Sequence, residues 1–331
     1  MNIFWFRRDL RLGDNRAFYE MAQFEDFGAI YIHDATLQSQ DDFSSLHRDF
    51  IDESLNDLSK NFIDCGGFLN IYEGESVEIF SSLITRYNIQ RVYTNSEVGS
   101  KPIRARDLAL EKLFKSHRVK WLVYQNNGVV DHLKNRDGWS EKWNKKMYKP
   151  IVQNVNPSRT KRLEIDSSES IFYESKVYKV DHQKRYNGGE KNGHDQLNYF
   201  LNSSGKTYSS DISSPLGSEK SCSRLSPYLT FGNLSIRQII KATRDRQKEL
   251  RELKSRDGWL KSLSAFSSRL RWHCHFIQKL EMQPNLEYTN MVRAFDGMRD
   301  SHSEILFNAW KNAITGYPMV DACMRFLKKT G

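Results

Sequence analysis

The sequence predicts an α/β N-terminal domain, built on a doubly wound parallel sheet of five strands, followed by an all-α part. Up to about residue 124, short apolar and β-branched runs alternate with amphipathic helical patterns, which is typical of βαβ units. From about Asp195 onward only helical periods occur. The 331 residues are enough for two domains.

Five runs are candidate strands, and helical faces lie between them. The strands are predicted at Ile3–Phe6, Ala29–His33, Phe68–Tyr72, Arg91–Thr94 and Lys120–Tyr124. Apolar residues recur at helical spacing within 46–62, 77–87 and 103–114. Parallel sheets of this kind bind ligands beyond the carboxyl ends of their strands. Because no GxGxxG follows the first strand, an NAD-dependent enzyme is disfavoured.

The domain boundaries are expected at 1–130 for the α/β domain, 131–194 for an interdomain linker and 195–331 for the helical domain. Within the linker, one short packed helix is predicted from the helical spacing of Trp139, Trp143, Met147 and Tyr148. The Lys- and Tyr-rich run 173–186 fits either a nucleic-acid contact or solvated linker. Later helices are predicted at Asp195–Leu201, Ser235–Leu253, Trp259–Glu281, Ser303–Ile314 and Met319–Lys329.

The net charge of +9 is unevenly distributed along the chain. Residues 1–130 carry 15 Lys and Arg against 19 Asp and Glu, whereas the remainder carries 35 against 22. This asymmetry indicates that a polyanion meets the second half, although a solvated basic surface gives the same pattern. Four scattered cysteines without a CxxC indicate a reducing compartment. No apolar run approaches the ~20 residues of a membrane helix, so the chain is expected to be soluble and cytoplasmic.

Charged residues follow the first predicted strand directly, at the ligand-binding end of the sheet. The loop reads Arg7-Arg8-Asp9-Leu10-Arg11-Leu12-Gly13-Asp14-Asn15. One interpretation is a site for an anionic or nucleotide-like molecule. The other is an Arg–Asp network that pins the loop, with Asp14 capping the next helix. The residues by themselves favour the structural role.

A second motif reads Ser221-Cys222-Ser223-Arg224-Leu225-Ser226-Pro227-Tyr228-Leu229-Thr230-Phe231-Gly232. Ser223 or Ser226 is expected to be an N-cap, with Pro227 at the first helical position. An ordinary capped helix start is one interpretation of the motif. The other is a phosphate or pyrophosphate site, formed by the helix N-terminus, the hydroxyl groups and Arg224.

A third feature is the aromatic and cationic stretch 264–276 in a predicted helix. It is either an aromatic-rich core helix or a set of stacking platforms with cations, suited to a flavin or a base. His273 and His275 are two residues apart and point to different sides of a helix, so no metal site is expected.

In combination these motifs resemble the photolyase/cryptochrome family over essentially the whole chain. The resemblance is carried, in the family's order, by Phe4–Arg11 with Asp14-Asn15, by Cys222–Leu229 with Gly232 and Ser235, and by Trp310 with Thr315–Arg325. It implies an α/β antenna domain joined by a long linker to a helical FAD domain. It also implies blue-light-driven electron transfer from reduced FAD to a pyrimidine dimer flipped out of damaged DNA, which suits the basic second half. A second antenna chromophore, of folate or deazaflavin type, is possible in the N-terminal domain.

The resemblance also assigns site residues. Those implied to bind FAD are Tyr208, Cys222, Ser223, Arg224, Leu225, Ser226, Phe266, Arg269 and His273. Those implied to face DNA are Arg269, Trp272, His273, His275 and Phe276. Trp272 and Arg269 are the implied catalytic residues, with Trp272 stacking on the flipped lesion.

Two departures from the family pattern open alternatives. Arg269 stands where many members carry a glutamate that hydrogen-bonds the lesion, and His273-Cys274 replaces the usual Arg-Glu. A cation there inverts the local electrostatics and favours either another lesion or a function without repair. The alternative is then a cryptochrome-like flavin photoreceptor or a DNA-binding flavoprotein without repair activity. The chain also ends at Thr330-Gly331, where the family continues. The helical domain is therefore expected to be truncated, to hold FAD weakly, and to need a completing chain or a homodimer; an inactive remnant is the further alternative.

Overall fold

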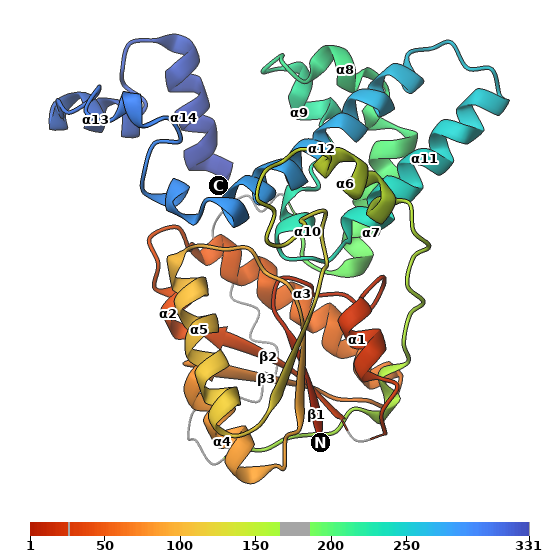
Figure 1. The fold of residues 1–331 in the computed structure, drawn as a ribbon. Helices are drawn as coiled ribbons and strands as arrows, with labels where there is room; N and C mark the ends of the chain where they lie inside the picture. The colour runs from red at the N-terminus through yellow and green to blue at the C-terminus, as the bar shows by residue number, and fades with distance from the viewer. Residues whose placement is uncertain (26, 166–185, 331) are drawn as a thin grey trace.

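The chain forms an α/β part and a helical part, which lie one above the other in Figure 1. The computed structural model describes residues 1–25, 27–165 and 186–330. The Lys- and Tyr-rich run predicted at 173–186 lies almost entirely outside the described residues. Within the described ranges, no helix combines the length and the apolar character needed to cross a membrane. All four cysteines are free.

The sheet has five parallel strands in the order β3-β2-β1-β4-β5. The strands are β1 (Asn2–Phe6), β2 (Phe27–Asp34), β3 (Leu69–Gly74), β4 (Arg91–Asn95) and β5 (Lys120–Tyr124). All five predicted strands are therefore confirmed to within two residues at each end. The two central strands β1 and β2 are buried along their whole length, which explains their almost continuous apolar sequences.

Helices cover both faces of the sheet. They are α1 (Arg16–Met21), α2 (Ala35–Gln38), α3 (Ser45–Asp64), α4 (Ser76–Arg86) and α5 (Lys101–Ser116). Successive side chains of a strand point to opposite faces, so β1 serves two cores. Phe4 and Phe6 pack with α1 and α3, whereas Ile3 and Trp5 pack with α4 and α5. The doubly wound arrangement is confirmed.

The linker contains α6 (Trp139–Met147) and the short 3-10 helix η1 (Pro157–Arg159). Trp139, Trp143 and Met147 are buried against the helical core, as their spacing predicts. Tyr148 departs from the prediction: it is the C-cap of α6 and 51% exposed. Its ring lies 4.1 Å from the Arg244 guanidinium instead.

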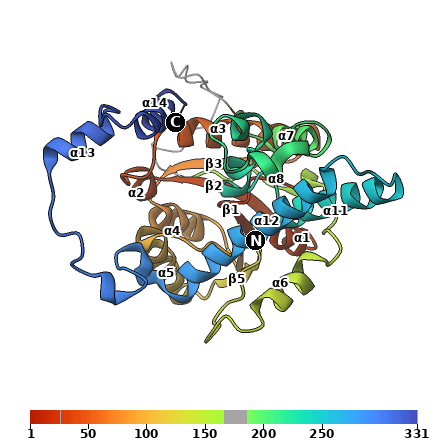
Figure 2. The same ribbon diagram turned by 90° about the horizontal axis from the view of Figure 1, so that it is seen from above.

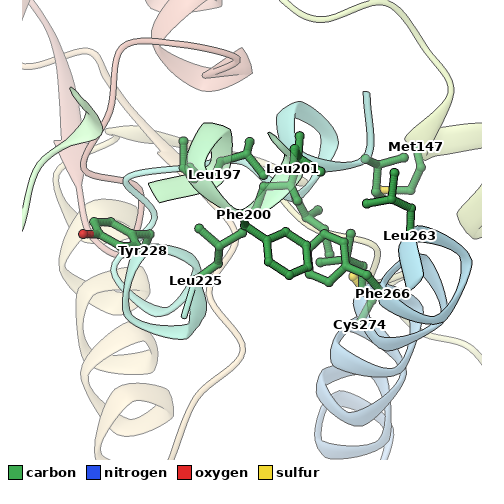
Figure 3. Close-up of a cluster of buried hydrophobic side chains, with 14 of the residues drawn as sticks. Met147, Leu197, Phe200, Leu201, Leu225, Tyr228, Leu263, Phe266 and Cys274 are labelled. Carbon is green, nitrogen blue, oxygen red and sulfur yellow. The ribbon is translucent and has the colours of Figure 1, made fainter. Parts of the chain in front are cut away.

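The second part is helical, and no strand occurs between residues 186 and 330. Its short elements are η2 (Ser204–Thr207), α8 (Tyr208–Asp211), α9 (Gly217–Ser221), α10 (Ser226–Thr230), η3 (Pro284–Glu287) and η4 (Arg293–Phe295). Its longer helices are α7 (Glu190–Asn202), α11 (Ile236–Glu252), α12 (Trp259–Met282), α13 (Glu304–Lys311) and α14 (Pro318–Thr330). Figure 3 shows part of its apolar core, in which Phe200 and Phe266 lie together between α7 and α12.

Helix α7 begins at Glu190, five residues before the predicted start. The reason is a set of side chains on α3 that bind three consecutive backbone N–H groups. Gly188 donates to Glu53 (2.7 Å), Gly189 to Ser54 (3.1 Å) and Glu190 to Asp57 (2.8 Å). Side chains of the α/β part thus accept hydrogen bonds from backbone N–H groups at the start of α7, which have no acceptor within the helix. These bonds hold the two parts of the chain together.

The loop after β1 joins the two parts. Arg11 is 1% exposed, and its guanidinium donates to the carbonyls of Gly13 (2.9 Å), Asp14 (3.2 Å) and Gly232 (2.7 Å). Asp14 accepts from the Ser235 hydroxyl (2.6 Å). The structural interpretation of this loop is confirmed for these residues. One detail was wrong: Asn15, not Asp14, caps α1, because Asp14 is drawn to the helical part.

Candidate functional site

The 221–226 loop belongs to the helical part, with Ser221 and Leu225 buried, Ser226 exposed and the residues between them half-buried. Leu225 is the N-cap of α10, Ser226 is its first residue and Pro227 its second, so the predicted serine cap is wrong. The cause is Arg224, whose backbone adopts φ +56° and turns the chain before the helix. The Arg224 guanidinium reaches back to the carbonyls of Ser218 (3.4 Å) and Glu219 (3.3 Å).

Tyr208 and Phe266 form the apolar side of the same region. Phe266 is 3% exposed, and its ring centroid lies 4.6 Å from that of Phe200 and 5.8 Å from that of Tyr208. Burial raises the pKa of Tyr208 to about 12, with Cys222 and Arg269 close enough to affect it. Burial also raises the pKa of the Cys222 thiol. The structure therefore brings these residues of the predicted FAD set together.

The donor chemistry of this region fits the phosphates of a dinucleotide. The Ser223 and Ser226 hydroxyls flank the cationic Arg224 on one loop, whereas the buried Ser221 hydroxyl donates to the carbonyl of Gly217 (3.1 Å). The buried Ser204 hydroxyl has no hydrogen-bond partner among the described residues. It lies on η2, which packs against α12 and against α9, the helix that leads into the loop. These polar groups could hold FAD phosphates, with Tyr208 and Phe266 behind them.

A groove of about 520 Å³ separates α6 and α12, and we call it the α6–α12 groove. Trp272 (49% exposed) and Phe276 (58% exposed) stand in it edge to face, with ring centroids 6.4 Å apart. The Arg269 guanidinium lies 4.6 Å from the Trp272 ring, and the Lys279 amine 5.5 Å from the Phe276 ring. Aromatic faces bordered by cations suit a base attached to a phosphate backbone.

His275 joins the two walls of this groove. Its Nε2 accepts from the Arg136 guanidinium at 3.2 Å, and its ring lies 5.6 Å from that of Trp139. Desolvation, Arg136 and Lys279 all lower the pKa of His275. The imidazole is therefore held in the neutral form that accepts this hydrogen bond.

His273 is not brought together with the other residues predicted to face DNA. It lines a different cavity, of about 260 Å³, between the strand ends and the helical part, which we call the interdomain cavity. Its walls include Arg8, Asn126 and Ile277. Burial lowers the pKa of His273, and its Nδ1 has no hydrogen-bond partner among the described residues.

A further cavity of about 260 Å³ lies at the carboxyl ends of β1 and β2, which we call the strand-end cavity. Arg7, Arg8 and Arg106 line it together with Glu97 and aromatic side chains, Phe231 of the helical part among them. Arg8 is the cation of the N-terminal motif that stays half-exposed, at 50%. Ligand binding by this motif therefore stays a prediction for Arg8.

Sequence reasoning missed Arg136, Trp139 and Lys279 as parts of the groove. Trp139 was predicted only as a packing residue, and Arg136 lies in an irregular segment before α6. Lys279 is one turn beyond Phe276 on the same helix, so the α12 periodicity contained a signal for it.

Comparisons with known proteins fit this arrangement. A family model described as DNA photolyase matches residues 2–153, and one described as the FAD binding domain of DNA photolyase matches residues 266–331. The deoxyribodipyrimidine photo-lyase of Agrobacterium fabrum is 26% identical, over 99% of this chain and 69% of that protein. Cryptochrome DASH of Arabidopsis thaliana is also 26% identical, over 100% of this chain and 61% of that protein.

Solved structures share the fold over the whole chain. The bacterial class III photolyase of Agrobacterium tumefaciens superposes with a TM-score of 0.80 at 22% identity, covering 100% of this chain and 69% of that one. An archaeal photolyase of Sulfolobus tokodaii, solved with two FAD molecules, gives a TM-score of 0.74 at 22% identity and covers 71% of that chain.

The fold and the site thus define a class of protein in which an α/β domain is joined to a helical, flavin-binding domain. The two family models together cover well over half of the sequence, and the chain belongs to the DNA photolyase/cryptochrome family. The match of residues 266–331 also confirms FAD as the expected cofactor. The chain spans about three-fifths to two-thirds of the length of the relatives it matches.

Proposed function

We propose that this chain is the FAD-binding and DNA-contacting part of a photolyase-type protein, which splits pyrimidine dimers in damaged DNA under blue light. The α6–α12 groove is the observation that carries the proposal. It combines two accessible aromatic rings with cations from both walls, and it lies in the basic half of the chain. When bound, reduced FAD supplies the light-excited electron for the reaction.

The chain's own residues would bind and orient the lesion. Trp272 would stack on a base flipped out of the helix, because an aromatic face accepts any base. Arg269, whose guanidinium lies over the Trp272 ring, would carry a positive charge next to that base. Neutral His275 would keep Arg136 at the rim, where a phosphate can reach it.

An irradiated oligonucleotide containing one pyrimidine dimer tests this role. We expect dimer splitting under blue light with FAD and reductant. We also expect Trp272→Ala to weaken binding to the damaged strand by about 1–3 kcal/mol, the value of one stacked base. Tyr199→Ala is the control, since Tyr199 is similarly exposed (58%) on α7, outside the groove. Equal affinities for both variants and wild type would contradict the assignment.

A second candidate function is flavin-based light sensing or DNA binding without repair. It is favoured by one observation, the cation Arg269 beside Trp272 where a carboxylate would support dimer splitting. Cryptochromes are also among the relatives. The same oligonucleotide separates the two functions, because binding with light-dependent flavin spectra but no splitting identifies the second.

The 221–226 loop is proposed to hold the FAD phosphates. Arg224→Ala removes its cation and should lower the flavin absorbance retained after purification, because a charge-assisted contact is lost. Lys220→Ala on α9 is the control for loss of a nearby positive charge. Equal flavin content in wild type and both variants, with unchanged melting temperatures, would show that the loop does not hold FAD.

Two further roles extend this proposal. The strand-end cavity, with its arginines and aromatic rings, is the proposed place for an antenna chromophore. The four free cysteines and the absence of a spanning helix within the described ranges support the cytoplasm as the proposed compartment.

A further inference from the structure

Strand β5 is an edge of the parallel sheet and its least buried strand. Figure 2 shows the sheet from above, with β3 and β5 at opposite edges. At the β3 edge, Leu69, Asn70 and Tyr72 are buried. In β5 every residue is exposed or half-buried, and Val123 is 52% exposed. A largely apolar strand therefore borders solvent at this edge.

The backbone of β5 presents unpaired hydrogen-bonding groups there. The Lys120 N–H donates to the carbonyl just before β4 (2.9 Å), and the Tyr124 carbonyl accepts from the N–H just after β4 (2.7 Å). Both residues thus turn their backbone groups toward β4. Since successive residues of a strand turn these groups to opposite sides, Trp121 and Val123 turn theirs to the open edge. Within residues 1–25, 27–165 and 186–330, no other segment makes a hydrogen bond to these outward groups.

The strand also lacks the devices that prevent an edge from pairing with another chain. Natural edges usually carry a proline, a bulge or a charge within the strand. The pairing of β5 with β4 is regular over its whole length, it contains no proline, and its one charged residue, Lys120, is at its first position. This edge is therefore able to accept another strand.

The side chains of β5 are complementary to those of a second β5. When two copies run antiparallel about a twofold axis at Leu122, Trp121 of one meets Val123 of the other, and Lys120 meets Tyr124. Each Trp121–Val123 pair then exchanges two N–H···O bonds through the outward groups. An aromatic ring beside a β-branched side chain, and a cation beside an aromatic ring, are favourable cross-strand pairs.

Charges beside the strand favour a second copy as the partner. Burial and then the Glu20 carboxylate on α1 raise the pKa of Tyr124, while Arg16 opposes them. Glu20 therefore lies near the side chain that Lys120 of the other copy would face. The contact also joins the α/β parts, where residues 1–130 carry 15 Lys and Arg against 19 Asp and Glu, so the basic second halves of two chains need not meet.

We propose that β5 is a dimerisation strand, at which two copies of this chain join their sheets edge to edge in antiparallel register. The inference does not rest on the proposed function. Because one strand pair is a small interface, the dimer is weak and reversible, with a dissociation constant on the order of 10 µM. Sedimentation of the full chain should show its mass rising from monomer toward dimer between about 1 and 200 µM.

Val123→Pro tests the outward backbone groups. Proline lacks the N–H, which β4 does not use at this position, so the strand should keep its place in the sheet while dimerisation weakens at least tenfold. Val123→Thr is the matched control, since threonine keeps the N–H and the branched shape, and its dimerisation should stay within threefold of wild type. Circular dichroism checks that both variants fold. A wild-type chain that stays monomeric, or a dimer that Val123→Pro leaves unchanged, overturns the proposal.

A cysteine at the twofold axis tests the register without a proline. In a chain with the exposed Cys65 and Cys323 changed to serine, Leu122→Cys should form an intermolecular disulfide on mild oxidation. Opposed residues at such a non-hydrogen-bonded position have Cα atoms about 4.5 Å apart, within reach of a disulfide. Lys120→Cys, on the same face, should not crosslink, because it meets Tyr124 instead of its own counterpart. Equal crosslinking of the two variants, or none, also overturns the proposal. These measurements need neither flavin nor light, so their failure is separate from failure of the proposed function.

Discussion

Glu97 is buried between the strand-end cavity and the interdomain cavity, which it lines on both sides, and its carboxylate lies against three arginines. The distances are 2.9 Å to Arg106, 3.2 Å to Arg8 and 3.5 Å to Arg7. Burial by itself would raise the pKa of Glu97, but the arginines outweigh it and hold the pKa at about 2. A carboxylate with a depressed pKa stabilises the fold above its unfolded pKa, and this contribution is lost as the pH falls from about 4.5 to 2.

Glu97→Gln should therefore lower the free energy of unfolding at pH 7 on the order of 3 kcal/mol, because buried cations lose their counter-charge. The difference between variant and wild type should shrink as the pH approaches 2, since the wild-type carboxylate is then protonated as well. Urea unfolding at pH 7 and at pH 2.5 measures both values. Glu111→Gln, on the exposed side of α5, is the control and should change little. A difference that does not depend on pH would contradict the assignment.

The arginines of the first loop show where residue-scale prediction stops. Arg8 and Arg11 stand three positions apart in one charged motif, for which the residues by themselves favour a structural network over ligand binding. The Arg11 guanidinium donates to backbone carbonyls from both parts of the chain, whereas Arg8 lines two cavities. The partners of Arg11 include Gly232, which is 221 positions away, so local pattern alone could not separate the two.

At the scale of the element, helix periodicity placed α12 correctly and separated His273 from His275. It did not place α6 beside α12, because the linker between them carries no signal for the pairing of two distant helices. The groove became visible only through contacts such as Arg136 with His275. The predicted cap of α10 failed for a similar reason, since the left-handed backbone of Arg224 depends on its contacts with α9.

Gly232 ends α10 at the joint between the two parts, and its position predicts a large effect of a methyl group. A Cβ there would collide with the backbone of Arg8, and the backbone is left-handed at φ +73°. Gly66 has a similar φ of +80° with open space around it. Gly66→Ala should cost about 1–2 kcal/mol from backbone strain alone, and Gly232→Ala about 2 kcal/mol more, because the two parts must separate. Urea unfolding of the two variants measures the difference in their free energies of unfolding. Equal decreases would show that the backbone of Arg8 moves away from the added methyl group at little cost.

At the scale of the whole molecule, composition and order of elements predicted most of the architecture. The alternation of strands and helices specified the parallel sheet, and the loss of strands after the linker specified the helical part. The charge difference between the two halves indicated a polyanion. What the sequence could not provide was the surface that would meet it, because the cations of the groove come from the linker and from α12 together.

The salt dependence of DNA binding tests whether this surface is the α6–α12 groove. Arg136 and Lys279 line the groove, and Arg269 lies over its Trp272 ring. Arg271 also lines the groove but donates to the Asn144 side chain, so the first three are the cations assigned to phosphates. Each phosphate neutralised on a single strand adds about 0.7 to the slope of log K against log salt, so three contacts give a slope of about −2. Arg136→Gln should reduce the magnitude of the slope by about 0.7, since one released counterion is lost. Lys248→Gln, on the exposed face of α11, should leave it unchanged.

The measurement is fluorescence anisotropy of a labelled single strand from 50 to 300 mM salt, roughly the range over which such slopes are resolved. A slope near zero, or the same slope for wild type and Arg136→Gln, would place the DNA on another face of the molecule.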